Sequence, residues 1–140
     1  MLLKKVLLCC LLVWCFVQVT AKSLDQCKSV FNASTKQKLC KANRYERIAG
    51  VDMDKTLDCV MRAANMVHKS GAGNFQALFK PMNAVEENGR KHNFSLESCM
   101  SKKLTEELPQ GKRAHAFYKC VMESESKAAF KKVFNQKVCQ

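Results

Sequence analysis

The cysteine pattern constrains this chain most, because it indicates both a cellular compartment and the way in which a small core is held together. The chain has 140 residues and nine cysteines. Three of these cysteines, Cys9, Cys10 and Cys15, lie in an apolar amino-terminal segment. An even remainder in a small chain of an oxidising compartment predicts three disulfides, although its spacing does not choose among the many pairings. That remainder is Cys27, Cys40, Cys59, Cys99, Cys120 and Cys139.

Residues 1–21 have the features of a secretory signal peptide. Lys4 and Lys5 precede an uncharged apolar run that ends at Val19, and small residues follow up to Ala21. The run is too short, and wrongly flanked, for a membrane span. We therefore expect cleavage after Ala21 and one secreted, extracellular domain over residues 22–140.

The chain is strongly basic. Its formal charge is +12, and the loss of Lys4 and Lys5 with the signal peptide leaves +10. Such a charge favours anionic partners such as heparan sulfate, phospholipid headgroups or nucleic acid. The lysines are spread along several segments without a block of like charges, so an ordinary solvated surface is the alternative interpretation.

Apolar residues recur at helical spacing along most of the mature chain. They predict a helix that Asp52 or Asp54 caps and that Gly71-Ala72-Gly73 ends, and another that contains Pro81. The last thirty residues carry two such patterns back to back, with aromatic side chains that could line a small-molecule cavity.

Weaker signals predict further short helices. One covers residues 24–31, a second starts at a Ser34–Gln37 capping box, and a third covers residues 96–107 after a turn at Asn88-Gly89. Asn32 and Asn93 each begin an Asn-x-Ser glycosylation sequon. Because no alternating β pattern of useful length occurs, the predicted class is all-α, with six or seven short helices and three disulfides.

The residue patterns of enzymes and metal sites are missing from the sequence. His68, His92 and His115 are scattered, and none has a second ligand at helical spacing. There is no nucleophile elbow, phosphate loop or calcium loop. We therefore expect neither catalysis, nor a cofactor, nor a bound metal.

Several stretches resemble the short-form D-seven salivary proteins of blood-feeding mosquitoes, which are relatives of insect odorant-binding proteins. The resemblance runs from about Cys27 to Phe134. It rests on Asp52-Met53-Asp54-Lys55 with Leu57-Asp58-Cys59-Val60-Met61, on Lys80-Pro81-Met82-Asn83-Ala84-Val85-Glu86 and Arg90-Lys91-His92-Asn93-Phe94, and on Gly111-Lys112-Arg113-Ala114, Tyr118-Lys119-Cys120 and Ala129-Phe130-Lys131-Lys132-Val133-Phe134.

This resemblance implies an odorant-binding-like helical bundle with a central pocket, secreted from the salivary gland. It also implies the pairings Cys27–Cys59, Cys40–Cys139 and Cys99–Cys120. Family members scavenge serotonin, histamine and noradrenaline at the bite, which assists blood feeding. Some relatives bind eicosanoids or inhibit the contact pathway of coagulation.

The amine site of the family is altered in this chain. A buried ammonium needs carboxylate partners, and the family's amine binders supply an aspartate and a glutamate. Asn135 and Val138 stand at those positions, while Asn43 and Thr56 replace an arginine and a histidine. The ligand-binding positions that the resemblance implies are therefore Arg44, Tyr45, Thr56, Tyr118, Phe134 and Asn135. The ending Lys137-Val138-Cys139 also follows Phe134 sooner than in the family, which would remove one wall of the pocket.

These substitutions predict a salivary ligand-binding protein that binds amines weakly or not at all. In one alternative, Glu123 or Glu125 supplies the missing carboxylate. In a second, the chain is a basic anti-haemostatic protein that binds anionic polysaccharide, anionic surfaces or a clotting factor, with a vestigial pocket. In a third alternative, the chain is a poorly functional relative that has kept the fold and lost the activity. We expect a monomer without a membrane span or a nucleic-acid partner.

Overall fold

Seven helical elements build the domain in the computed structural model, which describes residues 24–140. They are α2 (Ala33–Lys41), α3 (Met53–Ala63), α4 (Phe75–Val85), α5 (Gly89–Ser98), the short π-helical turn η1 (Lys103–Glu107), α6 (Gln110–Met122) and α7 (Lys127–Val138). An isolated bridge between Val67 and Gly73 is the nearest approach to a strand in the described part of the chain. The all-α prediction is thus confirmed, whereas the predicted signal peptide lies outside the described residues. None of the described helices has the length and apolar character to cross a membrane.

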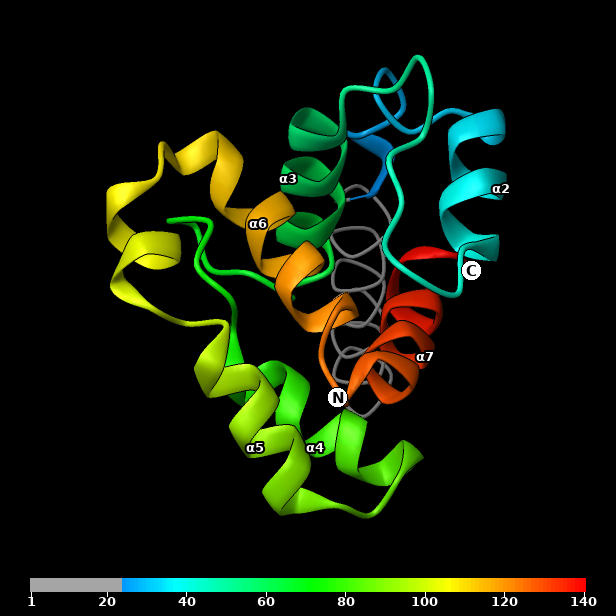
Figure 1. Cartoon of the computed structure of the whole chain (residues 1–140). Helices are drawn as coiled ribbons and strands as arrows, with labels where there is room; N and C mark the ends of the chain where they lie inside the picture. The colour runs from blue at the N-terminus through cyan, green and yellow to red at the C-terminus, as the bar shows by residue number, and fades with distance from the viewer. Residues whose placement is uncertain (1–23) are drawn as a thin grey trace, which may run out of the picture.

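The helices pack in pairs around one core. α3 lies against α6, and α4 contacts both α5 and α7, while α6 and α7 also pack on each other. Figure 1 shows α4 and α5 side by side at one end of the molecule, with α3 and α6 at the other. The carboxyl-terminal end of α7 lies beside the end of α2 (Figure 1). Side chains from α3, α4, α6 and α7 supply most of the fully buried apolar residues.

Three disulfides join elements that are far apart in the sequence. Cys27 pairs with Cys59, Cys40 with Cys139, and Cys99 with Cys120. These are the pairs that the family resemblance implies. The Cys40–Cys139 bond closes a separation of 99 residues, and a loop of that length contributes roughly 5 kcal/mol in the chain-entropy description.

Asparagine and aspartate side chains begin four of the helices. Asp52 Oδ1 accepts a hydrogen bond from the Lys55 amide at 3.1 Å, so of the two predicted caps for α3 it is Asp52 that serves. Asn32 caps α2 in the same way, which makes the prediction of a start at Ser34 two residues late. Asn74 and Asn88 cap α4 and α5. Each of these side chains satisfies an amide that has no partner within its helix.

The prediction for residues 88–107 was wrong. Asn88-Gly89 starts α5 instead of forming a turn between elements, because the Asn88 side chain accepts a hydrogen bond from the Lys91 amide. As a result, α5 ends at Ser98, and the single helix predicted for residues 96–107 is divided between the end of α5 and η1. The second sequon therefore lies inside a helix.

The helix that Asp52 caps ends earlier than predicted, well before Gly71-Ala72-Gly73. α3 stops at Ala63, and Asn65 follows in the left-handed region at a φ of 57°. Gly71 and Gly73 lie in the loop after α3, where the backbone requires glycine for two other reasons. Gly71 adopts a φ of +84°, and a Cβ on Gly73 would lie 2.2 Å from the Phe117 ring, so this loop can pass close to α6 only without a side chain there.

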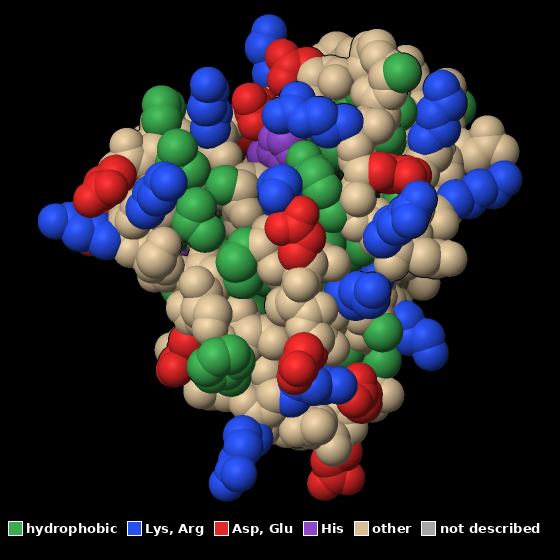
Figure 2. All heavy atoms as spheres, in the orientation of Figure 1, with side chains coloured by type: hydrophobic (Ala, Val, Ile, Leu, Met, Phe, Trp, Pro, Cys, Tyr) green, Lys and Arg blue, Asp and Glu red, His purple; other side chains and the backbone are tan. Residues whose placement is uncertain are grey.

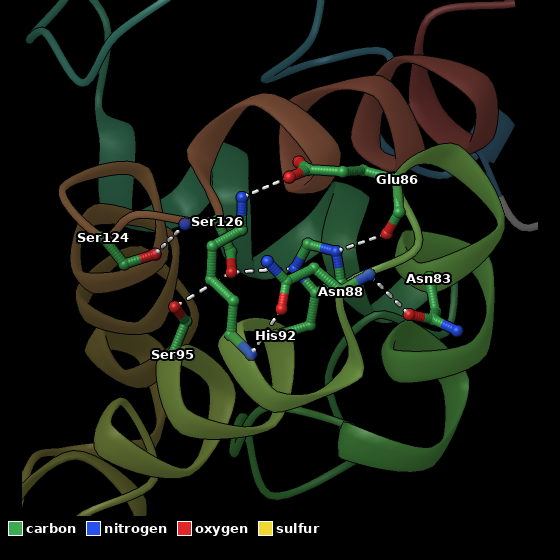
Figure 3. Close-up of polar contacts among 8 residues, drawn as sticks. Asn83, Glu86, Asn88, His92, Ser95, Ser124 and Ser126 are labelled. Carbon is green, nitrogen blue, oxygen red and sulfur yellow. Dashed lines mark hydrogen bonds and ion pairs between the residues drawn. The ribbon is translucent and has the colours of Figure 1, made fainter.

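A buried polar network joins α4, α5 and α7. The His92 side chain is fully buried, and its Nε2 donates to the Glu86 carbonyl at 2.8 Å. Its Nδ1 lies 2.9 Å from Ser126 Oγ, which in turn lies 2.9 Å from Ser95 Oγ. Figure 3 shows these side chains converging between the end of α4, α5 and the residue that precedes α7. Every polar atom of this cluster has a partner, so the network fixes how the three helices meet.

Candidate ligand-binding site

The last two helices bring four aromatic rings together, as their sequence pattern predicted. The centroid of the Tyr118 ring lies 5.9 Å from that of Phe130 and 5.2 Å from that of Phe134. Phe117 meets Phe130 edge to face at 6.2 Å, and Tyr45 from the loop after α2 approaches Tyr118 at 6.4 Å. Such tilted and edge-on pairs are favourable arrangements for rings in a core. We call these five residues the aromatic cluster.

The hydroxyl of Tyr118 has no hydrogen-bond partner within the described structure. Tyr118 is only 1% exposed, and its Oη is the one buried side-chain polar atom without a partner among the described residues. Burial, together with the nearby Tyr45 and Glu46, raises the pKa of this phenol, so it stays protonated and can donate. Leaving a buried hydroxyl unpaired costs about 1–3 kcal/mol. The protein therefore holds an unpaired hydrogen-bond donor in a buried aromatic environment.

A buried lysine stands next to the aromatic cluster. The side chain of Lys131 is 6% exposed, and its Nζ lies 5.5 Å from the centroid of the Phe134 ring. It donates to the carbonyls of Leu39 and Cys40, each at 2.9 Å, and to Asn135 Oδ1 at 2.8 Å. These carbonyls belong to the last turn of α2, where helix carbonyls lack intrahelical partners and a positive charge is favourable.

No carboxylate shares the hydrogen bonds of this ammonium. Its described partners are all neutral, and burial lowers the pKa of Lys131 to about 8. Asn135 also donates through Nδ2 to the Cys40 carbonyl at 3.2 Å. The Asn135 side chain thus accepts from an internal cation, and this end of the cluster is electropositive.

A second polar chain lies on the outer side of the cluster. Tyr45 Oη is 2.7 Å from His115 Nε2, and His115 Nδ1 is 2.7 Å from Asp54 Oδ1. These three residues line a surface cleft of about 260 Å³, which also includes Lys112 and Lys119. The Lys119 ammonium stands 5.2 Å from the centroid of the Tyr45 ring. Tyr45 therefore belongs both to the lining of this cleft and to the aromatic cluster.

The structure brings some of the predicted ligand residues together and separates others. Tyr45, Tyr118 and Phe134 belong to the aromatic cluster, and Asn135 lies at its electropositive end. Thr56 is buried and donates to the Val30 carbonyl at 3.1 Å, so it ties α3 to the segment before α2.

Three further positions that the family resemblance implied lie outside the aromatic cluster. Arg44 and Asn43 are exposed in the loop after α2. Val138 is 1% exposed and belongs to the apolar core.

The two alternative carboxylates lie on the surface. Glu123 is exposed beyond the end of α6 and pairs with Lys119 at 2.9 Å. Glu125 is exposed in the turn between α6 and α7. In this arrangement neither points into the aromatic cluster.

Sequence reasoning missed His115, Asp54 and Lys131. His115 occurs on the buried face of α6, three residues before Tyr118, and that spacing could have indicated a role beside the cluster. Lys131 precedes Asn135 by four residues, which places the two on one helix face. No local signal could have shown that this lysine reaches the end of α2, because that contact spans 91 residues.

The chain is similar to several salivary proteins of mosquitoes. It is 46% identical over 117 residues to the short form salivary protein D7R1 of Anopheles stephensi, covering 84% of this chain and 69% of the relative. It is also 46% identical to the D7R1 protein of Anopheles gambiae over 120 residues, covering 86% of this chain and 71% of that protein. Identity to D7R4 of Anopheles gambiae is 38% over 117 residues, with 84% and 69% covered. No profile of a known protein family matches the chain.

A solved structure shares this fold. It is a crystal structure of the Anopheles gambiae D7R4–norepinephrine complex, which superposes with a TM-score of 0.64 at 38% sequence identity. The match covers 81% of this chain and 76% of that protein. The predicted odorant-binding-like bundle is therefore confirmed for the described residues.

Proposed function

Because the chain belongs to the short-form D7 salivary proteins, we propose that it is a secreted binder of small aromatic or amphipathic host mediators, acting at the bite to assist blood feeding. The observation that carries the proposal is the Tyr118 hydroxyl, which is buried among aromatic rings without a partner. The related D7R4 protein was crystallised with norepinephrine, a small aromatic amine. A site made of Tyr45, Tyr118 and Phe134 would stack on such a ring and donate one hydrogen bond to it.

We expect the ring of a ligand to be accepted more readily than an ammonium group. An ammonium that donated to Asn135 Oδ1 would share that oxygen with Lys131 Nζ, which already lies 2.8 Å from it. The two nitrogens would then be within about 6 Å of each other, and at an effective dielectric constant of ~20 their repulsion is about 3 kcal/mol. Such a penalty weakens binding roughly a hundredfold. Serotonin, histamine and noradrenaline should therefore bind more weakly than neutral phenols or anionic amphipathic molecules such as eicosanoids.

Displacement of a fluorescent probe tests the existence of the pocket. The neutral apolar dye phenylnaphthylamine should bind the oxidised, secreted protein at one site per chain, and neutral phenols should displace it. Phe134→Ala should weaken dye binding at least tenfold, because this ring is fully buried in the aromatic cluster. Phe94→Ala is the matched control, since Phe94 is 72% exposed on α5. Saturable dye binding that is equal in both variants, each with native circular dichroism, would place the site elsewhere.

A second candidate function rests on the charge of α2 and α7. Neither helix contains an aspartate or glutamate, and their exposed lysines form no ion pair within residues 24–140. Figure 2 shows Lys and Arg side chains along the side of the molecule that α2 and α7 form, with acidic side chains among them. Such a surface suits an anionic polysaccharide such as heparan sulfate.

Heparin chromatography separates the two candidates. If polysaccharide binding is specific, neutralising Lys36, Lys38 and Lys41 on α2 should lower the eluting salt concentration more than neutralising Lys80, Lys102 and Lys103, which lie on other elements. Equal effects of the two triple variants would indicate only the overall charge of the protein.

A further inference from the structure

Two Asn-x-Ser sequons in this chain have very different structural surroundings. The first, Asn32-Ala33-Ser34, lies at the start of α2, and all three residues are exposed. The second, at Asn93, lies inside α5. We infer that Asn32 carries an N-linked glycan in the secreted protein and that Asn93 does not. The inference rests on the secretion proposed above, because these glycans are added in the secretory pathway.

The cap geometry leaves the reactive nitrogen of Asn32 free. Asn32 Oδ1 accepts a hydrogen bond from the Thr35 amide at 2.9 Å and so faces the helix. In a planar amide Nδ2 then points away from that bond, and it donates to no other group within residues 24–140. Transfer of the glycan from a lipid-linked sugar diphosphate forms a bond between Nδ2 and the sugar C1 and breaks the C1–O bond to the diphosphate, which leaves with its lipid. Nδ2 loses one proton in this step, and Oδ1 is unchanged. Asn32 can therefore cap α2 and carry a glycan at the same time.

Other asparagine caps show what is particular to this position. Asn74 and Asn88 cap α4 and α5 with the same geometry. They are followed by Phe75-Gln76 and Gly89-Arg90, without the Ser or Thr that a sequon requires. The start of α2 is thus the one capped helix terminus in the described chain that also provides an acceptor sequon.

The second sequon has no comparable space around it. Asn93 is half-buried in α5, directly after His92, which is fully buried. Ser95 is 4% exposed, and its hydroxyl lies 2.9 Å from Ser126 Oγ in the network of Figure 3. A bulky sugar on Asn93 would oppose the packing of α5 on its neighbours. Molecules that fold and leave the cell should therefore carry none at this site.

The test is the intact mass of the full chain secreted from insect cells, before and after removal of N-glycans with a glycosidase. Wild type should lose the mass of one glycan. Ser34→Ala should lose none, because it removes the sequon but keeps the Asn32 cap, whereas Ser34→Thr and Asn93→Gln should behave as wild type. A wild-type chain without a glycan, or a mass loss that Asn93→Gln abolishes, would overturn the inference.

Two further measurements keep this test separate from neighbouring effects. A second form, with a generic secretion leader before residue 22, separates a failure of export from a failure of glycosylation. If this exported form carries no glycan at Asn32, the inference is wrong. Thermal unfolding then checks the double role of the asparagine. Ser34→Ala should leave the melting temperature of the deglycosylated protein unchanged, while Asn32→Ala should lower it. Equal melting temperatures would contradict the cap, and with it the geometry that frees Nδ2.

Discussion

Two buried regions of this molecule treat their polar groups in opposite ways. In the network around His92, both ring nitrogens and both serine hydroxyls have partners. In the aromatic cluster, the Tyr118 hydroxyl is equally buried but has none among the described residues. Satisfied networks specify how helices meet, whereas an unsatisfied donor costs stability and is retained where a ligand can use it. His92 thus belongs to the network that holds α4, α5 and α7 together, whereas the unpaired Tyr118 hydroxyl is the group on which the proposed ligand site rests.

Replacing His92 should produce the largest loss of stability. His92→Ala removes the two hydrogen bonds of the imidazole, to the Glu86 carbonyl and to Ser126 Oγ, and opens a cavity between α4, α5 and α7, so the free energy of unfolding should fall by about 3 kcal/mol. Denaturant unfolding measures this loss. His68→Ala, at an exposed position, should change stability by less than about 0.5 kcal/mol. Equal losses of stability in His92→Ala and His68→Ala would show that the buried network around His92 does not stabilise the fold.

The burial of Lys131 should make the free energy of unfolding depend on pH. Burial lowers the pKa of its ammonium to about 8, while in the unfolded chain it titrates near 10.5. Between these values the unfolded state binds more protons, so the contribution of Lys131 to the free energy of unfolding rises with pH, by about 1–2 kcal/mol from pH ~7.5 to ~9.5. The penalty for burying the charged ammonium is fully present only well below the folded pKa, at about pH 7 and lower.

The difference between wild type and Lys131→Met isolates this contribution, because the other lysines and tyrosines are common to both proteins. Between pH ~7.5 and ~9.5 the free energy of unfolding of the wild type should rise relative to that of Lys131→Met. Lys132→Met, which removes an exposed neighbour, should run parallel to wild type. A constant difference for Lys131→Met would mean that the ammonium is not desolvated.

The smallest effect on stability, and the most informative, should come from a pair of tyrosine variants. Tyr118→Phe removes an unpaired hydroxyl, so stability should stay equal or rise by up to about 1 kcal/mol, while the affinity for phenolic ligands falls roughly fivefold to tenfold. Tyr45→Phe breaks the 2.7 Å contact with His115 and should cost about 1 kcal/mol. Unfolding and dye displacement of both variants measure these effects. A destabilised Tyr118→Phe would show that its hydroxyl already has a partner in the free protein.

Much of the fold could be predicted from local pattern. The stripes of α3, α4, α6 and α7 repeat at helical spacing, and such long periodic signals are the most dependable. The predicted helix boundaries were wrong where a single asparagine determines the start or the end of a helix. The Asn32 and Asn88 side chains satisfy helix amides and so begin helices earlier than expected, and Asn65 ends α3 through its left-handed backbone.

The site could be predicted only in part, for a physical reason. Tyr118 and Phe134 carry a periodic signal, because they lie on the buried faces of their own helices. The contacts of Lys131 with the end of α2, and of His115 with Tyr45 and Asp54, join residues that are 61 or more positions apart. Such contacts are set by the packing of whole helices, and local periodicity contains no information about them.

In the proposed site, aromatic rings would contact the ligand, while the amide of Asn135 lies beside the internal ammonium of Lys131 where a carboxylate would favour a bound amine. Calorimetric titration with noradrenaline of wild type, Asn135→Asp and Gln136→Glu tests this proposal most directly. Both variants add one negative charge to α7, but only Asn135 accepts from Lys131, while Gln136 is exposed. We expect noradrenaline to bind weakly to wild type and to Gln136→Glu, and at least about tenfold more tightly to Asn135→Asp. Submicromolar binding to wild type that Asn135→Asp leaves unchanged would contradict it.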